Sequence, residues 1–424
     1  MKVFVENDNL YSAEVKYIFN LFCKNMNISF HFVPEYLDAD ISIGDLERNK
    51  IKINRNFFDL LSQNIFAHRK HFQSEPYIKF SNGEVDFLST GFYMINCLQE
   101  IGSENIDKYG RFKYEGSYQE KFNIVTDNIV QNCFDKLAIE HFNVKILKKR
   151  SRIFLSHDID TIYGSLLQDG FYSLKKLRID WIINVFIQNV LKKPSWFNID
   201  KIMEIESEYN FRSTFYWLVN KGIVDSNLSN SDYEINSRKV KKALLDVESC
   251  GWENGLHKSA SDDSFQSEIE RLNVKIIGNR FHYLKFNPAK DFLQIEKSGL
   301  KFDSSLGFAE MYGFRNNYGL PYQPFNLETK EVFNFIECPL NIMDTTFFNY
   351  LKCDANKFLK DTIDFINKND QGSVLSILFH NNYISEYKFK DYFIAFKKLL
   401  LYLYESDFKS INQTDIIKEF KYEY

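Results

Sequence analysis

After residue 150 the sequence alternates between short apolar runs and amphipathic segments with a helical period. The apolar runs include RIFLS, FRSTFYWLV and SVLSILFHN, and helical patterns such as 264–278 and 288–299 end at a glycine. This alternation predicts parallel strands joined by helical crossovers. Polar residues recur at the ends of successive strands, and a barrel brings such ends to one face. We therefore expect an α/β fold in the form of a distorted (β/α) barrel.

The first 147 residues have a pattern of their own. VFVE and ISFHFV predict strands, residues 11–26 predict an amphipathic helix between them, and residues 85–102 predict a buried helix. The basic stretch KILKKRSR then precedes the first strongly apolar run. We therefore predict a smaller α/β domain of unassigned role over residues 1–147, without chemistry of its own, and the barrel domain over residues 148–424.

Charge and composition exclude some classes of protein. The net charge of −4 provides no basic face for nucleic acid, and the six cysteines form no C-x-x-C pair, so we expect reduced thiols. The start, MKVFVENDNL, lacks the pattern of a secretory signal, and no apolar run has the length of a membrane span. We expect a cytoplasmic protein. Residues 173–197, apolar in the middle and basic at both ends, fit a helix packed on its own domain better than an interfacial membrane helix.

Every histidine after residue 150 ends a strand-like run, and the first such run also carries two carboxylates. In SHDID, Asp158 and Asp160 point the same way if the strand continues, while His157 points the opposite way. Two carboxylates this close are costly unless a cation offsets them, although a pair of solvated loop carboxylates is an equal alternative. The neutral imidazole of His257 is a common metal ligand, and His380 is suited to proton donation to a leaving group. A structural role is the alternative for each histidine.

Three further segments have candidate functional residues. Arg280 and His282 share one face of RFHYLKF, where the arginine could orient a catalytic carboxylate, and Asp303 could hold the arginine. In the segment 307–325, Arg315 could pair with a carboxylate or phosphate of a substrate. Four aromatic residues of the same segment could stack on sugar faces, unless the segment is simply an ordered loop that closes the barrel: Tyr312, Tyr318, Tyr322 and Phe325.

These segments, in this order, resemble the polysaccharide deacetylase superfamily, the NodB-homology domain of carbohydrate esterase family 4. The resemblance spans roughly residues 150–415. The matching elements are a D-x-D segment after a strand, a T-F-Y strand at 214–216, a G-L-H segment, an arginine strand, an aspartate strand and a late strand that ends Leu-Phe-His380. The bacterial branch with S-H-D-x-D, G-L-H-x-S, R-x-H and G-F-R is the most similar, and its members often have an N-terminal region without an assigned activity.

The resemblance implies a divalent metal ion, with zinc expected, and hydrolysis of an N-acetyl group on an amino sugar or a polysaccharide precursor. The expected partner is therefore a carbohydrate. The resemblance also assigns roles: Asp158 as general base, Asp160 and His257 as metal ligands, Arg280 as the tether of the base, the backbone N–H of Tyr283 as an oxyanion donor, and His380 as the acid that protonates the departing amine.

One position departs from the family pattern. The family has H-x-x-x-H, whereas the second position here is Ser261, whose hydroxyl is a poorer zinc ligand than imidazole. We expect His282 to supply the missing nitrogen; the alternatives are weak metal binding or none. Two other functions therefore stay open: hydrolysis of another C–N bond, such as that of a cyclic amide, and glycan binding without cleavage.

Overall fold

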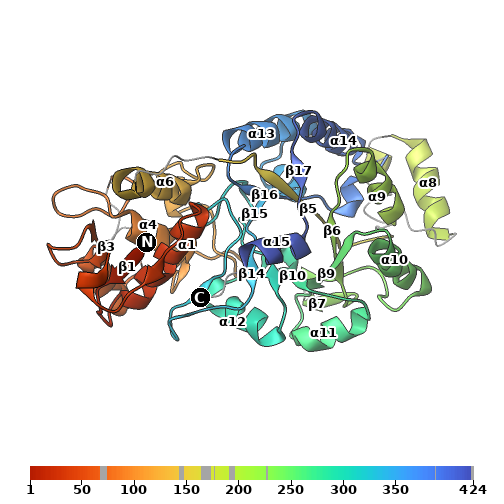
Figure 1. Ribbon diagram of the computed structural model, residues 1–424. Helices are drawn as coiled ribbons and strands as arrows, with labels where there is room; N and C mark the ends of the chain where they lie inside the picture. The colour runs from red at the N-terminus through yellow and green to blue at the C-terminus, as the bar shows by residue number, and fades with distance from the viewer. Residues whose placement is uncertain are drawn as a thin grey trace.

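Two parallel sheets organise the chain, which a computed structural model describes over residues 1–66, 74–142, 148–163, 173–175, 177–190, 196–225, 228–386 and 388–421. In Figure 1 the N-terminal part, red to orange, lies on the left, and the larger sheet with its helices lies on the right. The predicted domain boundary at residue 147 lies outside the described residues. One continuous apolar core includes residues of both parts, so the two parts pack against each other closely.

The N-terminal sheet has four parallel strands in the order β2-β1-β3-β4. Its strands and the predicted helices at 11–26 and 85–102 confirm a small α/β unit, although the sequence analysis missed β3. The strands are β1 (Lys2–Val5), β2 (His31–Phe32), β3 (Ile41–Gly44) and β4 (Ile51–Lys52). The helices are α1 (Ser12–Asn25), α2 (Arg55–Ser62), α4 (Phe87–Ile95), α5 (Tyr118–Lys121) and α6 (Ile129–Phe142).

The larger sheet has nine strands, and all of its pairings are parallel, in the order β14-β11-β10-β9-β6-β5-β16-β15 with β17 beside β5. The sheet curls, which confirms the predicted barrel-like α/β fold; within the described ranges no strand pairing joins β14 to β15, so the curl stays open. The strands are β5 (Arg152–Ile159), β6 (Thr214–Leu218), β9 (Glu253–Lys258), β10 (Gly278–Phe281), β11 (Phe302–Asp303), β14 (Ile336–Glu337), β15 (Leu340–Met343), β16 (Val374–Leu378) and β17 (Lys409–Ser410).

Helices lie around the outside of these strands in Figure 1, except for the last helix of the chain, which shares an apolar cluster with Phe154, Tyr216 and Phe302 of the strands. They are α8 (Ile179–Val190), α9 (Ile199–Glu208), α10 (Arg238–Ser249), α11 (Phe265–Leu272), α12 (Pro288–Ser298), α13 (Ala355–Lys368), α14 (Lys390–Glu405) and α15 (Gln413–Phe420). In α12, Pro288 stands in the first turn and Gly299 ends the helix with a φ of 77°, which a glycine adopts without strain.

The helix expected over 85–102 ends earlier, at Ile95, and two further boundaries differ from the sequence predictions beside β10. The helix expected over 264–278 ends at Leu272, because Asn273 takes a left-handed conformation, and Gly278 instead begins β10. The strand expected over 280–286 ends at Phe281, and the chain then turns at His282. This second difference matters because the turn aims His282 at the end of the neighbouring strands.

None of the helices in the described part of the chain combines the length and the apolar character that a membrane span requires. The predicted helix within 173–197 is present as α8, although residues 176 and 191–195 lie outside the described ranges. Ile179, Ile183 and Phe186 on α8 are more than half exposed. The suggested membrane contact of this helix stays a prediction.

Candidate metal centre

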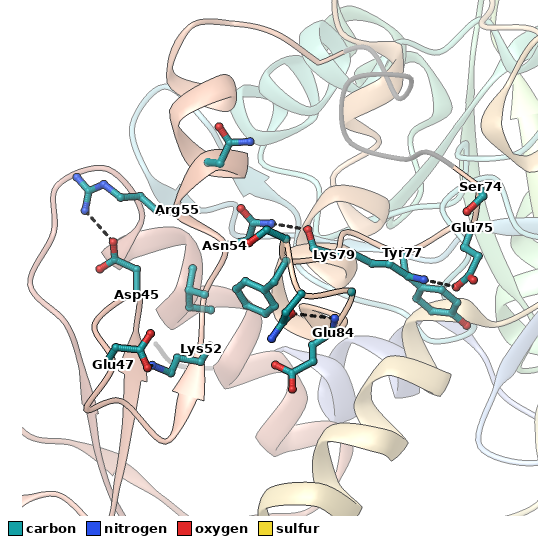
Figure 2. Close-up of a pocket in the computed structure, with 16 residues that line it drawn as sticks. Asp45, Glu47, Lys52, Asn54, Arg55, Ser74, Glu75, Tyr77, Lys79 and Glu84 are labelled. Carbon is teal, nitrogen blue, oxygen red and sulfur yellow. Dashed lines mark hydrogen bonds and ion pairs between the residues drawn. The ribbon is translucent and has the colours of Figure 1, made fainter.

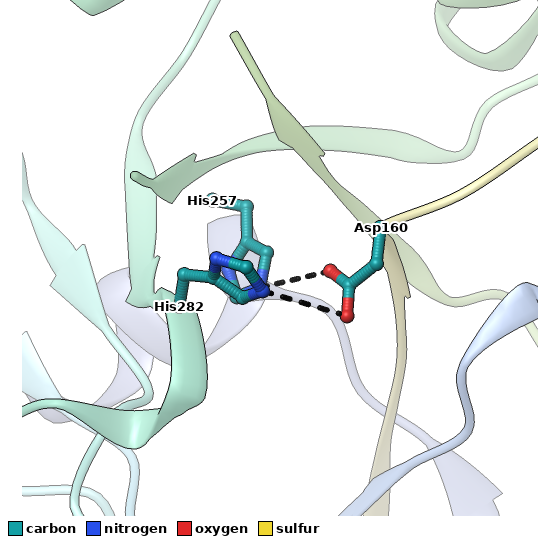
Figure 3. A group of neighbouring side chains, drawn as sticks. All are labelled: Asp160, His257 and His282. Carbon is teal, nitrogen blue, oxygen red and sulfur yellow. Dashed lines mark ion pairs between the residues drawn. The ribbon is translucent and has the colours of Figure 1, made fainter. Parts of the chain in front are cut away.

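Three strand ends bring Asp160, His257 and His282 together at the carboxyl edge of the larger sheet (Figure 3). Each residue offers one ligand atom, and these atoms lie within 4.8 Å of one another. His257 Nε2 is 3.3 Å from Asp160 Oδ1, and His282 Nε2 is 3.7 Å from Asp160 Oδ2. Asp160 follows β5, His257 lies on β9 and His282 follows β10, so parallel strands place all three at one edge.

The unpaired atoms of this cluster fit a divalent cation. Asp160 Oδ1 and His257 Nε2 are buried, and among the described residues neither has a hydrogen-bond partner. His257 Nδ1 faces the carbonyl oxygen of Arg280 at 2.9 Å, so it carries the proton and leaves the lone pair on Nε2 facing the cluster. One carboxylate and two imidazoles form a donor set typical of catalytic zinc.

Electrostatics in the cluster favour an ionised carboxylate. Burial alone would raise the pKa of Asp160, but His282, His257 and His380 around it hold that pKa well below its ordinary value. Burial lowers the pKa of His282, whereas Asp158 and Asp160 raise the pKa of His257 against the effect of its burial. An ionised Asp160 beside a neutral His282 matches the protonation that metal binding requires.

Ser261 lies in a different hydrogen-bond network. Its Oγ is 2.6 Å from Ser259 Oγ and accepts a hydrogen bond from Asn220 Nδ2 at 2.7 Å. Asn220 also donates to Asp263. Ser261 is therefore engaged by Ser259 of its own loop and by Asn220 of the loop after β6.

Asp158 is held by a buried arginine next to the cluster. Arg280 Nη1 donates to Asp158 Oδ1 and to Ser156 Oγ, both at 2.9 Å, and Arg280 Nε donates to the carbonyl oxygen of Ser304 at 2.8 Å. The guanidinium lies over the ring of Tyr216, 4.5 Å from its centre. The other carboxylate oxygen of Asp158 is 3.5 Å from His257 Nε2, so the carboxylate faces the same space as the three clustered side chains.

The prediction that Asp303 holds Arg280 is wrong. Asn279 pairs with Asp303 in the β10–β11 register, so these two side chains share a face and Asn279 donates to Asp303 at 2.7 Å. Arg280 points to the opposite face, where Ser304 meets it. Asp303 instead hydrogen-bonds with Glu337, whose pKa burial raises well above its ordinary value.

On the other side of the cluster, Asp344 holds His380. His380 Nδ1 donates to Asp344 Oδ1, and the backbone N–H of His380 donates to Asp344 Oδ2, each at 2.7 Å. His380 Nε2 is consequently directed inward and lies 3.6 Å from Asp160 Oδ2. Burial would lower the pKa of His380, but Asp344 raises it to about 10, with Asp160 and Asp158 contributing. Sequence reasoning missed Asp344, although LNIMD shows the same signal, a carboxylate at the end of an apolar run.

The fourth strand-end histidine, His157, has a structural role. It is fully buried and faces away from the cluster, as the alternation along β5 predicts. Its Nδ1 lies 2.8 Å from the carbonyl oxygen of Phe379, and its Nε2 lies 2.7 Å from Glu206 Oε1.

Tyr283 follows His282 in the turn and packs on it. Its ring stacks on the imidazole of His282 with the centres 4.0 Å apart, and its hydroxyl bonds to the backbone of Ser229. The role of its backbone N–H as an oxyanion donor stays a prediction.

The segment 307–325 is an ordered loop packed against the N-terminal part, so the prediction that Arg315 binds a substrate is wrong. Arg315 is 1% exposed and donates to both carboxylate oxygens of Glu100, at 2.9 and 2.6 Å. The aromatic residues of this loop pack on other side chains instead of offering their faces to a sugar. Tyr318 and Tyr322 are buried, Phe325 packs on Tyr17 with ring centres 4.9 Å apart, and Tyr312 stacks on Phe347.

A separate hollow of about 920 Å³ lies in the N-terminal part, beside β4 and α2 (Figure 2). Its described lining contains neither histidine nor cysteine. Opposite charges are already paired across it, as in Lys52–Glu47, Arg55–Asp45 and Lys79–Glu75. The hollow therefore has none of the carboxylate–imidazole chemistry found at the strand ends.

Comparisons with known proteins found one family model and several similar solved structures. Residues 3–141 match a family of unknown function, DUF7033, and no curated protein matches the chain. Similar solved structures include a protein described as a polysaccharide deacetylase from Mycobacterium smegmatis, with 14% identity, a TM-score of 0.42, and coverage of 64% of this chain and 90% of that chain. An allantoinase has 12% identity, a TM-score of 0.42 and the same coverage. The peptidoglycan deacetylase PdaC from Bacillus subtilis, as a mutant, has 10% identity, a TM-score of 0.33, and coverage of 64% and 92%.

Proposed function

We propose that this chain is a metal-dependent hydrolase that removes acetyl groups from an amino sugar or a polysaccharide precursor. The observation that carries the proposal is the convergence of Asp160, His257 and His282, with an arginine-held carboxylate on one side and an aspartate-held histidine on the other. The resemblance assigns roles to Asp160, His257 and His380, whereas His282 is proposed here in place of the ligand that the family has at the position of Ser261. The predicted cytoplasmic location stays a prediction.

In this proposal Asp160, His257 and His282 hold one divalent metal ion, with zinc expected. Such an ion, when bound, polarises an amide carbonyl and lowers the pKa of a water molecule. Asp158 then acts as the general base, because the hydrogen bond from Arg280 holds its carboxylate facing the cluster.

His380 is the proposed general acid. Its Nε2 faces the cluster, and Asp344 keeps the ring protonated near neutral pH. Water adds to the amide carbon, Asp158 takes the proton of the water, and His380 donates a proton to the departing nitrogen as the C–N bond breaks. The products are acetate and a free amine. The backbone N–H of Tyr283 is the proposed donor to the oxyanion.

The test begins with protein purified without chelators. We expect about one equivalent of metal and release of acetate from N-acetylated amino sugars linked to a nucleotide or a lipid. Cyclic amides are assayed in parallel, because their hydrolysis is the alternative function on the same site. A protein that takes up no metal favours the glycan-binding alternative, and a metal-loaded protein inactive on both substrate classes contradicts the proposed chemistry.

Variants separate metal binding from turnover. Asp158→Asn is expected to keep the metal and lose acetate release, whereas His282→Ala is expected to abolish metal uptake. Ser261→Ala is the matched control, because Ser261 bonds to Asn220 and Ser259, outside the cluster. Unchanged metal stoichiometry in His282→Ala would refute the assignment of His282 as a ligand.

A further inference from the structure

A tight hairpin of the N-terminal part lies against the turn that carries His282. Residues 106 and 112 form an antiparallel bridge, and Gly110 takes a φ of 80° in the turn between them. The carboxylate of Asp107 accepts hydrogen bonds from the backbone N–H groups of Tyr109 at 2.8 Å and Arg111 at 3.0 Å. The hairpin is therefore preorganised, because the side chain of Asp107 fixes the backbone of the turn.

Arg111 connects this hairpin to the turn after β10. The side chain is 5% exposed, and its Nε donates to Asp107 Oδ2 at 2.8 Å. Its Nη1 donates to the carbonyl oxygen of Tyr283 at 2.7 Å, and its Nη2 donates to the hydroxyl of Tyr350 at 3.0 Å. The buried guanidinium thus fixes the backbone at the residue that directly follows His282.

The turn needs such support because its backbone is strained. Tyr283 and Leu284 have φ values of 61° and 51°, a region that non-glycine residues enter rarely. A residue in this conformation persists only when its surroundings hold it. Hydrogen bonds hold Tyr283 at both ends: Arg111 donates to its carbonyl oxygen, and its hydroxyl bonds to the backbone and the hydroxyl of Ser229.

Aromatic stacking extends the contact from the hairpin to the imidazole itself. Tyr109 stacks on Tyr283 with the ring centres 5.6 Å apart and the planes at 8°, and Tyr283 in turn stacks on His282. The Arg111 guanidinium lies 4.8 Å from the centre of the Tyr109 ring. The orientation of the His282 ring therefore depends on two residues that lie more than 170 positions earlier in the chain.

We propose that Arg111 and Tyr109 are positioning residues that fix His282 for metal binding, so that the N-terminal part completes the metal centre. This inference rests on the proposed function, because it assumes that His282 is a ligand. The N-terminal part then has a specific role, since it holds the strained turn in the conformation in which His282 meets Asp160 and His257. Residues that orient a metal ligand typically change metal affinity by about 10- to 100-fold when they are replaced.

The experiment measures Co²⁺ binding by the full chain, through the dissociation constant and the absorption spectrum of the bound ion. Arg111→Met is expected to weaken Co²⁺ binding about tenfold or more and to change the spectrum. Arg111→Lys, which keeps a donor for Tyr283, is expected to restore part of the affinity, and Tyr109→Leu is expected to weaken binding by a smaller factor. Circular dichroism of each metal-free variant shows whether the fold is retained; if Arg111→Met does not fold, Tyr109→Leu decides.

The control is Tyr17→Phe, which removes a hydrogen bond of 2.9 Å from the N-terminal part to Gln323, away from the metal centre. Its dissociation constant is expected to equal that of the wild type. Folded Arg111 and Tyr109 variants that bind Co²⁺ within about twofold of the wild type, with the same spectrum, overturn this inference alone. A wild-type chain that binds no Co²⁺ overturns the proposed function together with it.

Discussion

The buried ion pair between Glu100 and Arg315 joins the two parts of the chain, and Glu100→Gln tests its role. Glu100 is 8% exposed and Arg315 is 1% exposed. Arg315 also donates to the carbonyl oxygen of Gly307 at 3.0 Å. Burial by itself would lower the pKa of Arg315, but Glu100 raises it, so the arginine is charged. The substitution keeps the shape of the side chain but removes the charge that compensates Arg315.

The expected loss of stability is large. Removal of one partner of a buried pair costs about 3–5 kcal/mol, because the remaining charge is left uncompensated. With a urea dependence of about 3 kcal/mol per M, a loss of about 4 kcal/mol lowers the unfolding midpoint by about 1.3 M. We expect the double variant Glu100→Gln/Arg315→Met to recover much of this loss, since it leaves no buried charge.

Urea unfolding followed by circular dichroism measures these differences. Lys360→Met is the control, because Lys360 and Asp364 form an exposed pair of 2.6 Å whose loss is expected to cost at most about 0.5 kcal/mol. A loss below about 1 kcal/mol in Glu100→Gln, or losses that simply add in the double variant, would contradict the argument that this pair joins the two parts.

Three further predictions concern the centre and its surroundings. In Asp344→Asn, His380 loses the charge that raises its pKa, so the alkaline limb of the pH profile of acetate release is expected to move to lower pH; an unmoved limb excludes His380 as the acid. Burial raises the pKa of Glu337, so the folded chain retains a proton that the unfolded chain releases above about pH 4.3, and stability falls as pH rises from there. In Glu337→Gln the free energy of unfolding, measured by urea unfolding between about pH 4 and pH 9, is expected to fall less steeply with pH. An equally steep fall in the variant would show that another group causes the pH dependence. Zinc at about 100 times its dissociation constant is expected to stabilise the wild type by about 2.7 kcal/mol and to leave His282→Ala unchanged, as thermal unfolding with and without chelator can measure.

Much of the fold could be predicted from the sequence, because its signals are local. The alternation of apolar runs and helical patterns identified most strands of the larger sheet and most helices around it. Parallel strands have their carboxyl ends at the same edge of the sheet. That is why Asp160, His257 and His380 could be selected as candidates before their positions were known. Asp344 has the same local signal, a carboxylate at the end of the apolar run LNIM, so the sequence predicts it as a candidate in the same way.

The sequence by itself determined the class of fold and the residue types available at the strand ends, since periodicity and chemistry are properties of short segments. Only the tertiary structure decided which side chains meet. The register of β10 and β11 assigned Ser304, not Asp303, to Arg280, and a strained turn, held by Arg111, aimed His282 at Asp160. Arg315 turned inward because Glu100, more than 200 positions earlier, compensates its charge. Such pairings depend on strand register and on the path of distant loops, which interactions across the whole chain determine.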